Sequence, residues 1–184
     1  MEAWRQADRV MTMSLQDHWR WGFAVQARAD LATLDLLSRQ PVDAVPKCHR
    51  LQFLQMACEK LVKAHLLDVG TFTPGRLRIH TVVAKHLPPI INEYYRRQTG
   101  RSMPPHLFQR VRSMVREIEL LAPAADDAGR QPANCEYPWL DVTGNQVYVP
   151  AEYAFRSLDL PRKPALRLIL KVLPIAIQAL AAAP

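Results

Sequence analysis

A run of arginines between positions 96 and 116 is the feature of this sequence that most clearly suggests chemistry. Its members are Arg96, Arg97, Arg101, Arg110, Arg112 and Arg116, with no acidic residue between them. Their combined charge of +6 nearly equals the formal net charge of +7 of the whole chain. A guanidinium binds phosphate through two parallel hydrogen bonds, and grouped charges attract anionic polymers or nucleotides through long-range, salt-screened forces. The competing interpretation is the ordinary solvated face of one helix.

The position of these arginines adds to the phosphate-binding hypothesis. A helix is predicted to begin next to Arg101, with Ser102 as its cap and two prolines in its first turn. The start of a helix offers free backbone N–H groups and the positive end of the helix dipole, both of which favour anions. We therefore expect Arg96, Arg97, Arg101 and Arg110 to form a phosphate-binding site.

A second polar pattern lies at positions 55 to 63. Gln55, Glu59 and Lys63 follow each other at intervals of four, so they share one flank of a helix. Exposed pairs of this kind contribute only about 0.2–0.5 kcal/mol each. The three side chains form either a surface ladder or a half-buried bridge to another helix, and the sequence leaves both open.

The elements that carry these residues are helical. Apolar residues recur at helical spacing and strand-like alternation is nearly absent. The spacing predicts helices over about 14–39, 47–69, 79–94, 102–121 and 164–183. The prolines at 88–89 are expected to kink or restart the third helix, and Pro174 to bend the last one. The stretch 123–150 is predicted to be a long loop. We expect an all-α fold, an antiparallel four-helix up-and-down bundle with an extra C-terminal helix, in one domain over 1–184.

Composition and cysteine content exclude several classes of protein. Hydrophobic residues make up 49% of the 184, which is enough for an ordinary core and argues against disorder. The three cysteines form no CxxC pair, which argues against a disulfide scaffold or zinc finger and favours a reduced, cytoplasmic protein. The apolar stretch 166–183 contains Arg167 and Lys171, so we interpret it as a core helix rather than a membrane span. No secretory signal is recognisable at the start, and no membrane association is expected.

The pattern in the second helix resembles the HEPN family of bacterial and archaeal helical-bundle proteins. That family carries Gln-x-x-x-Glu-Lys-x-x-Lys-Ala-x-Leu there, and the matching positions are Gln55, Glu59, Lys60, Lys63, Ala64 and Leu66. His80, expected to open the third helix, stands where many members have a histidine. The segment 136–138, Glu-Tyr-Pro, is similar to the family's Arg-Tyr-Pro, with Glu in place of Arg.

The resemblance implies two quite different activities. Some HEPN proteins bind nucleotides or RNA, often beside a nucleotidyltransferase. Others are dimeric, metal-independent ribonucleases with an Arg-x(4–6)-His motif, which Arg101 and His106 match. In that role the histidine would transfer a proton and the arginine would stabilise charge on the phosphorane.

We therefore expect a homodimeric module that binds RNA or a nucleotide, without cofactor or metal. It would be a component of a toxin–antitoxin pair or a companion of a nucleotidyltransferase or antitoxin chain. The alternative is an endoribonuclease that uses Arg101 and His106. An interaction protein or scaffold that contacts no nucleic acid also remains open.

The other histidines and the common catalytic motifs give no competing site. His65 and His86 lie on apolar stripes and are expected in the core or an interface. His80 is placed to hydrogen-bond near Glu59. No Walker A, GxGxxG, GxSxG or CxxC motif is present, so the usual NTPase, dehydrogenase, hydrolase and redox functions have no support.

Aromatic residues are concentrated in the predicted loop at Tyr137, Trp139 and Tyr148. Such rings stack on nucleic-acid bases or hold a loop against the protein, and we favour the second role.

Overall fold

The computed structural model describes residues 14–41, 43–76, 78–123, 133–141, 144–158 and 163–182. Within these residues lie five α-helices: α1 (Leu15–Ser38), α2 (Lys47–Asp68), α3 (Val83–Thr99), α4 (Pro105–Glu119) and α5 (Pro164–Ala181). The remaining elements are two short strands, β1 (Trp139–Asp141) and β2 (Gln146–Tyr148), and the 3-10 turns Pro74–Arg76 and Arg156–Leu158. The predicted all-α bundle with an extra C-terminal helix is confirmed.

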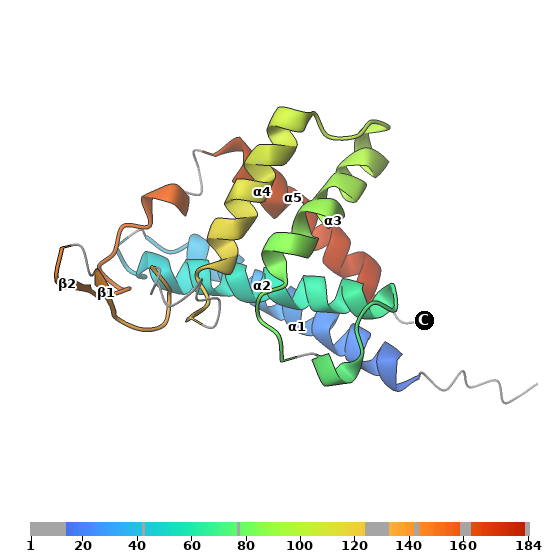
Figure 1. Ribbon diagram of the computed structural model, residues 1–184, viewed down its shortest axis with the longest axis horizontal. Helices are drawn as coiled ribbons and strands as arrows, with labels where there is room; N and C mark the ends of the chain where they lie inside the picture. The colour runs from blue at the N-terminus through green and yellow to red at the C-terminus, as the bar shows by residue number, and fades with distance from the viewer. Residues whose placement is uncertain are drawn as a thin grey trace, which may run out of the picture.

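The helices form two hairpins and one crossing helix (Figure 1). α1 and α2 lie side by side along the long axis, while α3 and α4 rise steeply from that pair and are joined by a turn at their far end. α5 passes behind and contacts all four. The arginine-rich segment therefore lies on the raised hairpin.

The first two helices begin and end within one residue of the predicted positions. Ser14 caps α1, because the Asp17 backbone N–H donates to its hydroxyl at 3.1 Å while Asp17 accepts from the Ser14 backbone N–H at 3.2 Å. α2 ends just before Gly70, whose φ of 69° is the left-handed conformation that favours glycine after a helix.

The third helix differs from the prediction in its start and in its continuity. It begins at Val83 rather than near residue 79, so His80 precedes the helix instead of opening it. α3 also runs unbroken through Pro88 and Pro89, so the predicted restart is wrong. Its Leu87 and Ile91 side chains are fully buried, and this packing outweighs the backbone bonds that the prolines remove.

The fourth helix begins without the predicted serine cap. α4 starts at Pro105 after Pro104, and Ser102 makes no capping bond. The turn before it is held instead by Asn92 of α3, whose side-chain oxygen accepts from the Met103 backbone N–H at 2.9 Å. At the other end of the hairpin, Glu119 of α4 accepts from the Ala84 N–H in the first turn of α3 at 2.8 Å.

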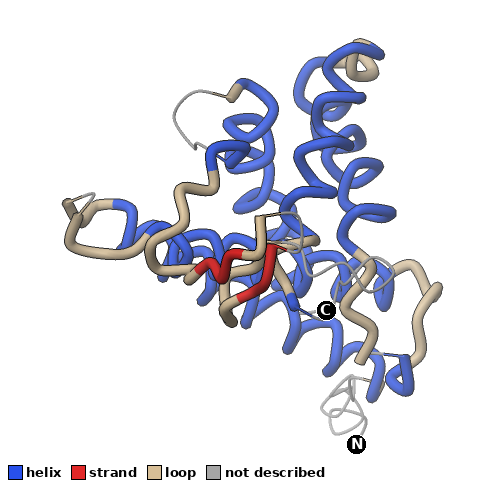
Figure 2. Tube along the Cα trace, turned by 60° about the vertical axis from the view of Figure 1, so that its left-hand side comes forward, coloured by secondary structure: helices blue, strands red, loops and turns tan. Residues whose placement is uncertain are grey.

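The predicted loop over 123–150 contains a small antiparallel sheet. Trp139 pairs with Tyr148 and Asp141 with Gln146, and Asn145 takes a φ of 48° in the connection. In Figure 2 the strands form a short ribbon outside the helices. Strands of three residues are too short to show alternation in a sequence, so this hairpin was missed. Positions 124–132 and 142–143 of the loop lie outside the described residues, as does the predicted end of the last helix at 183.

α5 is the one helix in the described part of the chain that is long and apolar enough to cross a membrane. Eight of its side chains are nevertheless buried, among them Leu166, Ile169 and Leu173, each at 0% exposure. These contacts with the other helices are what a core helix makes. The three cysteines are also buried and free, and burial raises the pKa of the Cys58 thiol.

Candidate functional site

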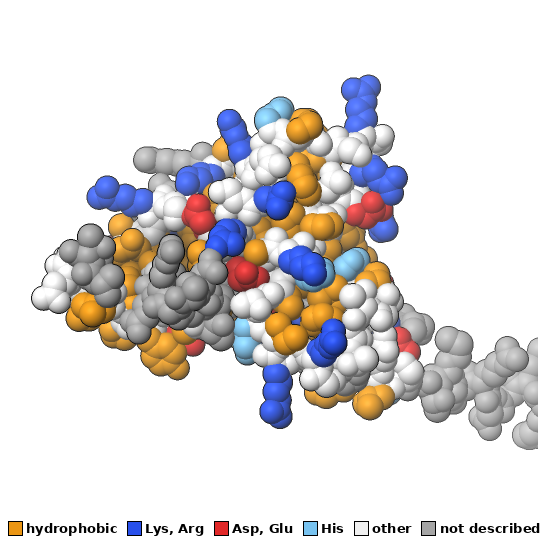
Figure 3. Space-filling view, in the orientation of Figure 1, with side chains coloured by type: hydrophobic (Ala, Val, Ile, Leu, Met, Phe, Trp, Pro, Cys, Tyr) orange, Lys and Arg blue, Asp and Glu red, His pale blue; other side chains and the backbone are white. Residues whose placement is uncertain are grey.

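The six arginines are distributed around the α3–α4 hairpin, and together they are called the arginine surface here. Arg96 and Arg97 lie in the last turn of α3, Arg101 lies in the connecting turn, and Arg110, Arg112 and Arg116 lie along α4; all six are exposed. On the face of the molecule that Figure 3 shows, the Lys and Arg side chains stand apart from one another rather than meeting at one point. An extended polyanion fits such a surface better than one small phosphate does.

Glu93 forms ion pairs with two of these arginines. Its carboxylate lies 2.9 Å from Arg96 Nη2 and 2.9 Å from Arg97 Nε, and the Arg97 guanidinium also lies over the Tyr94 ring. Hydrogen bonds from Arg97 and then Arg96 lower the pKa of Glu93. Glu93 lies just before the acid-free segment, so the charge count of that segment does not include it, although spacings of three and four indicate such pairs.

Arg101, Arg110 and Arg112 differ from Arg96 and Arg97 in this respect. Within the residues that the structure describes, no carboxylate lies within ion-pair distance of Arg101, Arg110 or Arg112. Their guanidinium groups therefore remain available to an anionic ligand.

The start of α4 does not supply the anion site that the sequence predicts. Pro104 and Pro105 have no backbone N–H, and the N–H groups of Leu107 and Phe108 both donate to the Pro104 carbonyl. Few free donors remain at this helix end. The predicted phosphate site therefore rests on the arginine side chains rather than on the helix terminus.

Arg101 and His106 are both exposed and lie on either side of the proline pair. His106 is the second residue of α4, whereas Arg101 lies in the turn, where its backbone N–H and carbonyl both contact the Thr99 hydroxyl. No hydrogen bond joins their two side chains in the described structure.

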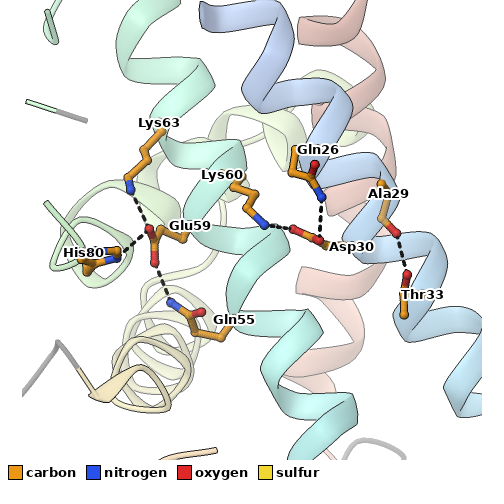
Figure 4. Close-up of polar contacts among 9 residues, drawn as sticks. All are labelled: Gln26, Ala29, Asp30, Thr33, Gln55, Glu59, Lys60, Lys63 and His80. Carbon is orange, nitrogen blue, oxygen red and sulfur yellow. Dashed lines mark hydrogen bonds and ion pairs between the residues drawn. The ribbon is translucent and has the colours of Figure 1, made fainter. Parts of the chain in front are cut away.

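The residues of the HEPN-like pattern surround a buried carboxylate (Figure 4). Glu59 accepts from Gln55 Nε2 at 2.9 Å and from Lys63 Nζ at 2.6 Å, and His80 Nδ1 lies 3.0 Å away. The Glu59 and Lys63 side chains are only 11% and 5% exposed. The three side chains are buried, so the surface ladder is wrong, but the bridge runs to His80 in the segment before α3 rather than to another helix.

Lys60 points away from that group. It forms an ion pair with Asp30 of α1, which also accepts from Gln26 at 3.1 Å (Figure 4). The residues of this pattern therefore make two contacts outside α2. Glu59 contacts His80 in the segment before α3, and Lys60 contacts Asp30 of α1. Both carboxylates are satisfied internally, so these residues hold the fold together rather than face a ligand.

The remaining candidates take structural positions. His65 and His86 are half-buried, and burial lowers the pKa of each. Trp139 is buried against Tyr148 and other rings, as expected for a loop held against the protein, while Tyr137 is exposed. Among the described residues, no group of three His, Cys, Asp or Glu is arranged to hold a metal ion.

Comparison of the chain with protein-family models, with curated proteins and with solved structures gave no match.

Proposed function

We propose that this protein is a HEPN-like module that binds single-stranded RNA along the arginine surface. The observation that supports it best is the exposure of Arg101, Arg110 and Arg112, which have no carboxylate partner in the described structure. Arg101 lies in the turn before α4, and Arg110 and Arg112 point about 200° apart around that helix, so a strand that contacts all three must wrap over the hairpin. Arg96 and Arg97 contribute less, because Glu93 competes for them.

The binding is electrostatic and therefore depends on salt. Three phosphate contacts with a single strand correspond to a slope of about −2.1 in log K against log salt concentration. Raising the salt from about 50 to 200 mM then weakens binding by roughly 18-fold.

The test compares two variants that lose the same charge. In the three-arginine variant, Arg101, Arg110 and Arg112 become glutamine; in the control, Arg28, Arg78 and Arg167 on other elements become glutamine. Binding of labelled single-stranded RNA is measured by fluorescence anisotropy across salt concentrations. We expect the first variant to lose the salt slope and the control to keep it. Equal loss in both would show that net charge, not this surface, attracts the RNA.

The HEPN resemblance supports three further parts of the proposal. The chain forms a homodimer, it works beside a nucleotidyltransferase or an antitoxin chain, and it acts in the cytoplasm, where free cysteines persist. Light scattering of the purified protein gives the oligomeric state, and co-purification from the native host gives the partner. A monomer that purifies alone would remove the first two parts.

A further inference from the structure

One side of α1 is apolar although the described residues leave it exposed. The outer stripe of α1 consists of Trp21, Val25, Ala29, Ala32 and Leu36. These residues follow each other at intervals of four, four, three and four, so they lie on one side of the helix. Trp21 is 42% exposed and Leu36 is 60% exposed, and both alanines are exposed as well.

The opposite side of α1 already packs against the core. Ala24, Ala27 and Leu34 are buried there, where α1 lies against α2 and α5. The solvent side of a surface helix is ordinarily polar, and a helix with apolar residues all round is typically buried all round. A continuous exposed apolar surface of this kind marks an interaction site. The outer stripe therefore indicates an interface.

The outer stripe continues into a groove between α1 and α5. The groove measures about 540 Å³, and its lining includes Leu31 and Ala32 of α1 and Leu170 and Pro174 of α5. Ala32 belongs to both the stripe and the groove. A helix that lies along the stripe can therefore place a large side chain at the edge of this recess.

The order of side chains in the outer stripe fits a second copy of the same helix that runs in the opposite direction. With a two-fold axis between positions 28 and 29, Trp21 of one copy lies opposite Leu36 of the other, and Val25 lies opposite Ala32. Ala29 of each copy lies at the centre, where its small side chain lets the two helices approach closely. A two-fold interface requires a self-complementary pattern of this kind.

Charged residues beside the outer stripe support the same arrangement. Asp17, Arg28, Asp35 and Arg39 follow each other at intervals of 11, 7 and 4, so they share one flank of α1. In the antiparallel pair, Asp17 of one copy lies opposite Arg39 of the other. Arg28 and the Asp35 of the other copy are roughly 9 Å apart along the axis, and because side chains lean toward the N-terminus of their helix, these two lean toward each other.

The charge pattern also fixes the direction of the two helices. Arg39 contacts Asp35 in its own chain, whereas no carboxylate of the described residues lies within ion-pair distance of Arg28. An antiparallel pair brings the two charged flanks together and gives Arg28 a partner. In a parallel pair the two flanks lie on opposite sides of the interface, so these charges do not meet.

We propose that a second copy of this chain packs antiparallel against the outer stripe of α1, about a two-fold axis between residues 28 and 29. This inference rests on the homodimer of the proposed function and supplies its interface and geometry. The arginine surface belongs to α3, α4 and the turn between them, so the interface involves a different pair of helices.

The first experiment is sedimentation velocity on the full chain with two matched variants. Leu36→Glu adds a charge to the outer stripe, and Val147→Glu adds the same charge to β2 at a residue that is 62% exposed. We expect the wild type to be a dimer at micromolar concentration, Leu36→Glu to dimerise at least tenfold more weakly, and Val147→Glu to behave as the wild type. Circular dichroism checks that both variants are folded.

The second experiment tests the direction of the helices with a short bis-maleimide crosslinker. Val25→Cys and Ala32→Cys are made as separate proteins, and the native cysteines are buried. A mixture of the two should give a crosslinked dimer. Each protein alone should give little, because its two introduced thiols lie roughly 10 Å apart along the axis. Equal crosslinking in each protein alone would overturn the antiparallel geometry.

The outcomes separate this interface from the other parts of the proposed function. If Leu36→Glu dimerises as tightly as the wild type, the homodimer uses another face and the interface is wrong. If the wild type stays monomeric, the outer stripe serves a different protein, and the homodimer fails as well. A dimer that Leu36→Glu weakens but that binds no RNA supports the interface and removes only the RNA part.

Discussion

The buried Glu59 carboxylate gives the sharpest prediction about the stability of the fold. In Glu59→Ala, Lys63 keeps its charge but loses its partner at 2.6 Å, and Gln55 and His80 lose their acceptor. Lys63 is only 5% exposed, so solvent cannot replace the carboxylate. Breaking a buried pair by removing one member costs about 3–5 kcal/mol, which corresponds to a drop of roughly 6–20 °C in Tm for a domain of this size.

The assay is equilibrium unfolding in urea, followed by circular dichroism, with two comparison variants. Asp35→Ala breaks the exposed ion pair with Arg39 and should cost less than about 1 kcal/mol. The double variant Glu59→Ala/Lys63→Met should recover part of the lost stability, because it no longer leaves a charge buried without a partner. If Glu59→Ala costs no more than Asp35→Ala, the carboxylate does not hold α2 to the segment before α3.

Three further predictions concern binding, pH and cleavage. The three-arginine variant should bind single-stranded RNA with a salt slope near zero, against about −2.1 for the wild type, and equal slopes in anisotropy titrations would contradict this. Burial lowers the pKa of His65 and His86, so the unfolded chain takes up their protons first as the pH falls through about 6.5. The free energy of unfolding should therefore be smaller at pH 5.5 than at pH 7.5, and replacing both with glutamine should flatten that difference in urea unfolding. If Arg101 and His106 act as a catalytic pair, the protein should cleave RNA in EDTA on denaturing gels and His106→Ala should abolish the cleavage, whereas unchanged cleavage in that variant would remove the ribonuclease alternative.

Local signals in the sequence were sufficient for most of the helical fold. The capping box at Ser14 and the glycine at position 70 mark helix ends through chemistry that involves only a few neighbouring residues. The start of α3 was misplaced because its first turn is capped by Glu119, which is 35 residues away in the chain. The Ser102 cap was wrong for a similar reason, since Asn92 on another helix holds that turn. Hydrogen bonds between residues on different helices leave no signal in the local sequence.

The candidate site shows the same division between local and long-range information. The spacing of Gln55, Glu59 and Lys63 placed them on one flank, but periodicity could not show whether solvent or the segment around His80 faces that flank. The positive charge of the arginine surface could be predicted from the sequence. Its partial neutralisation was not predicted, because Glu93 lies just outside the acid-free segment 96–116.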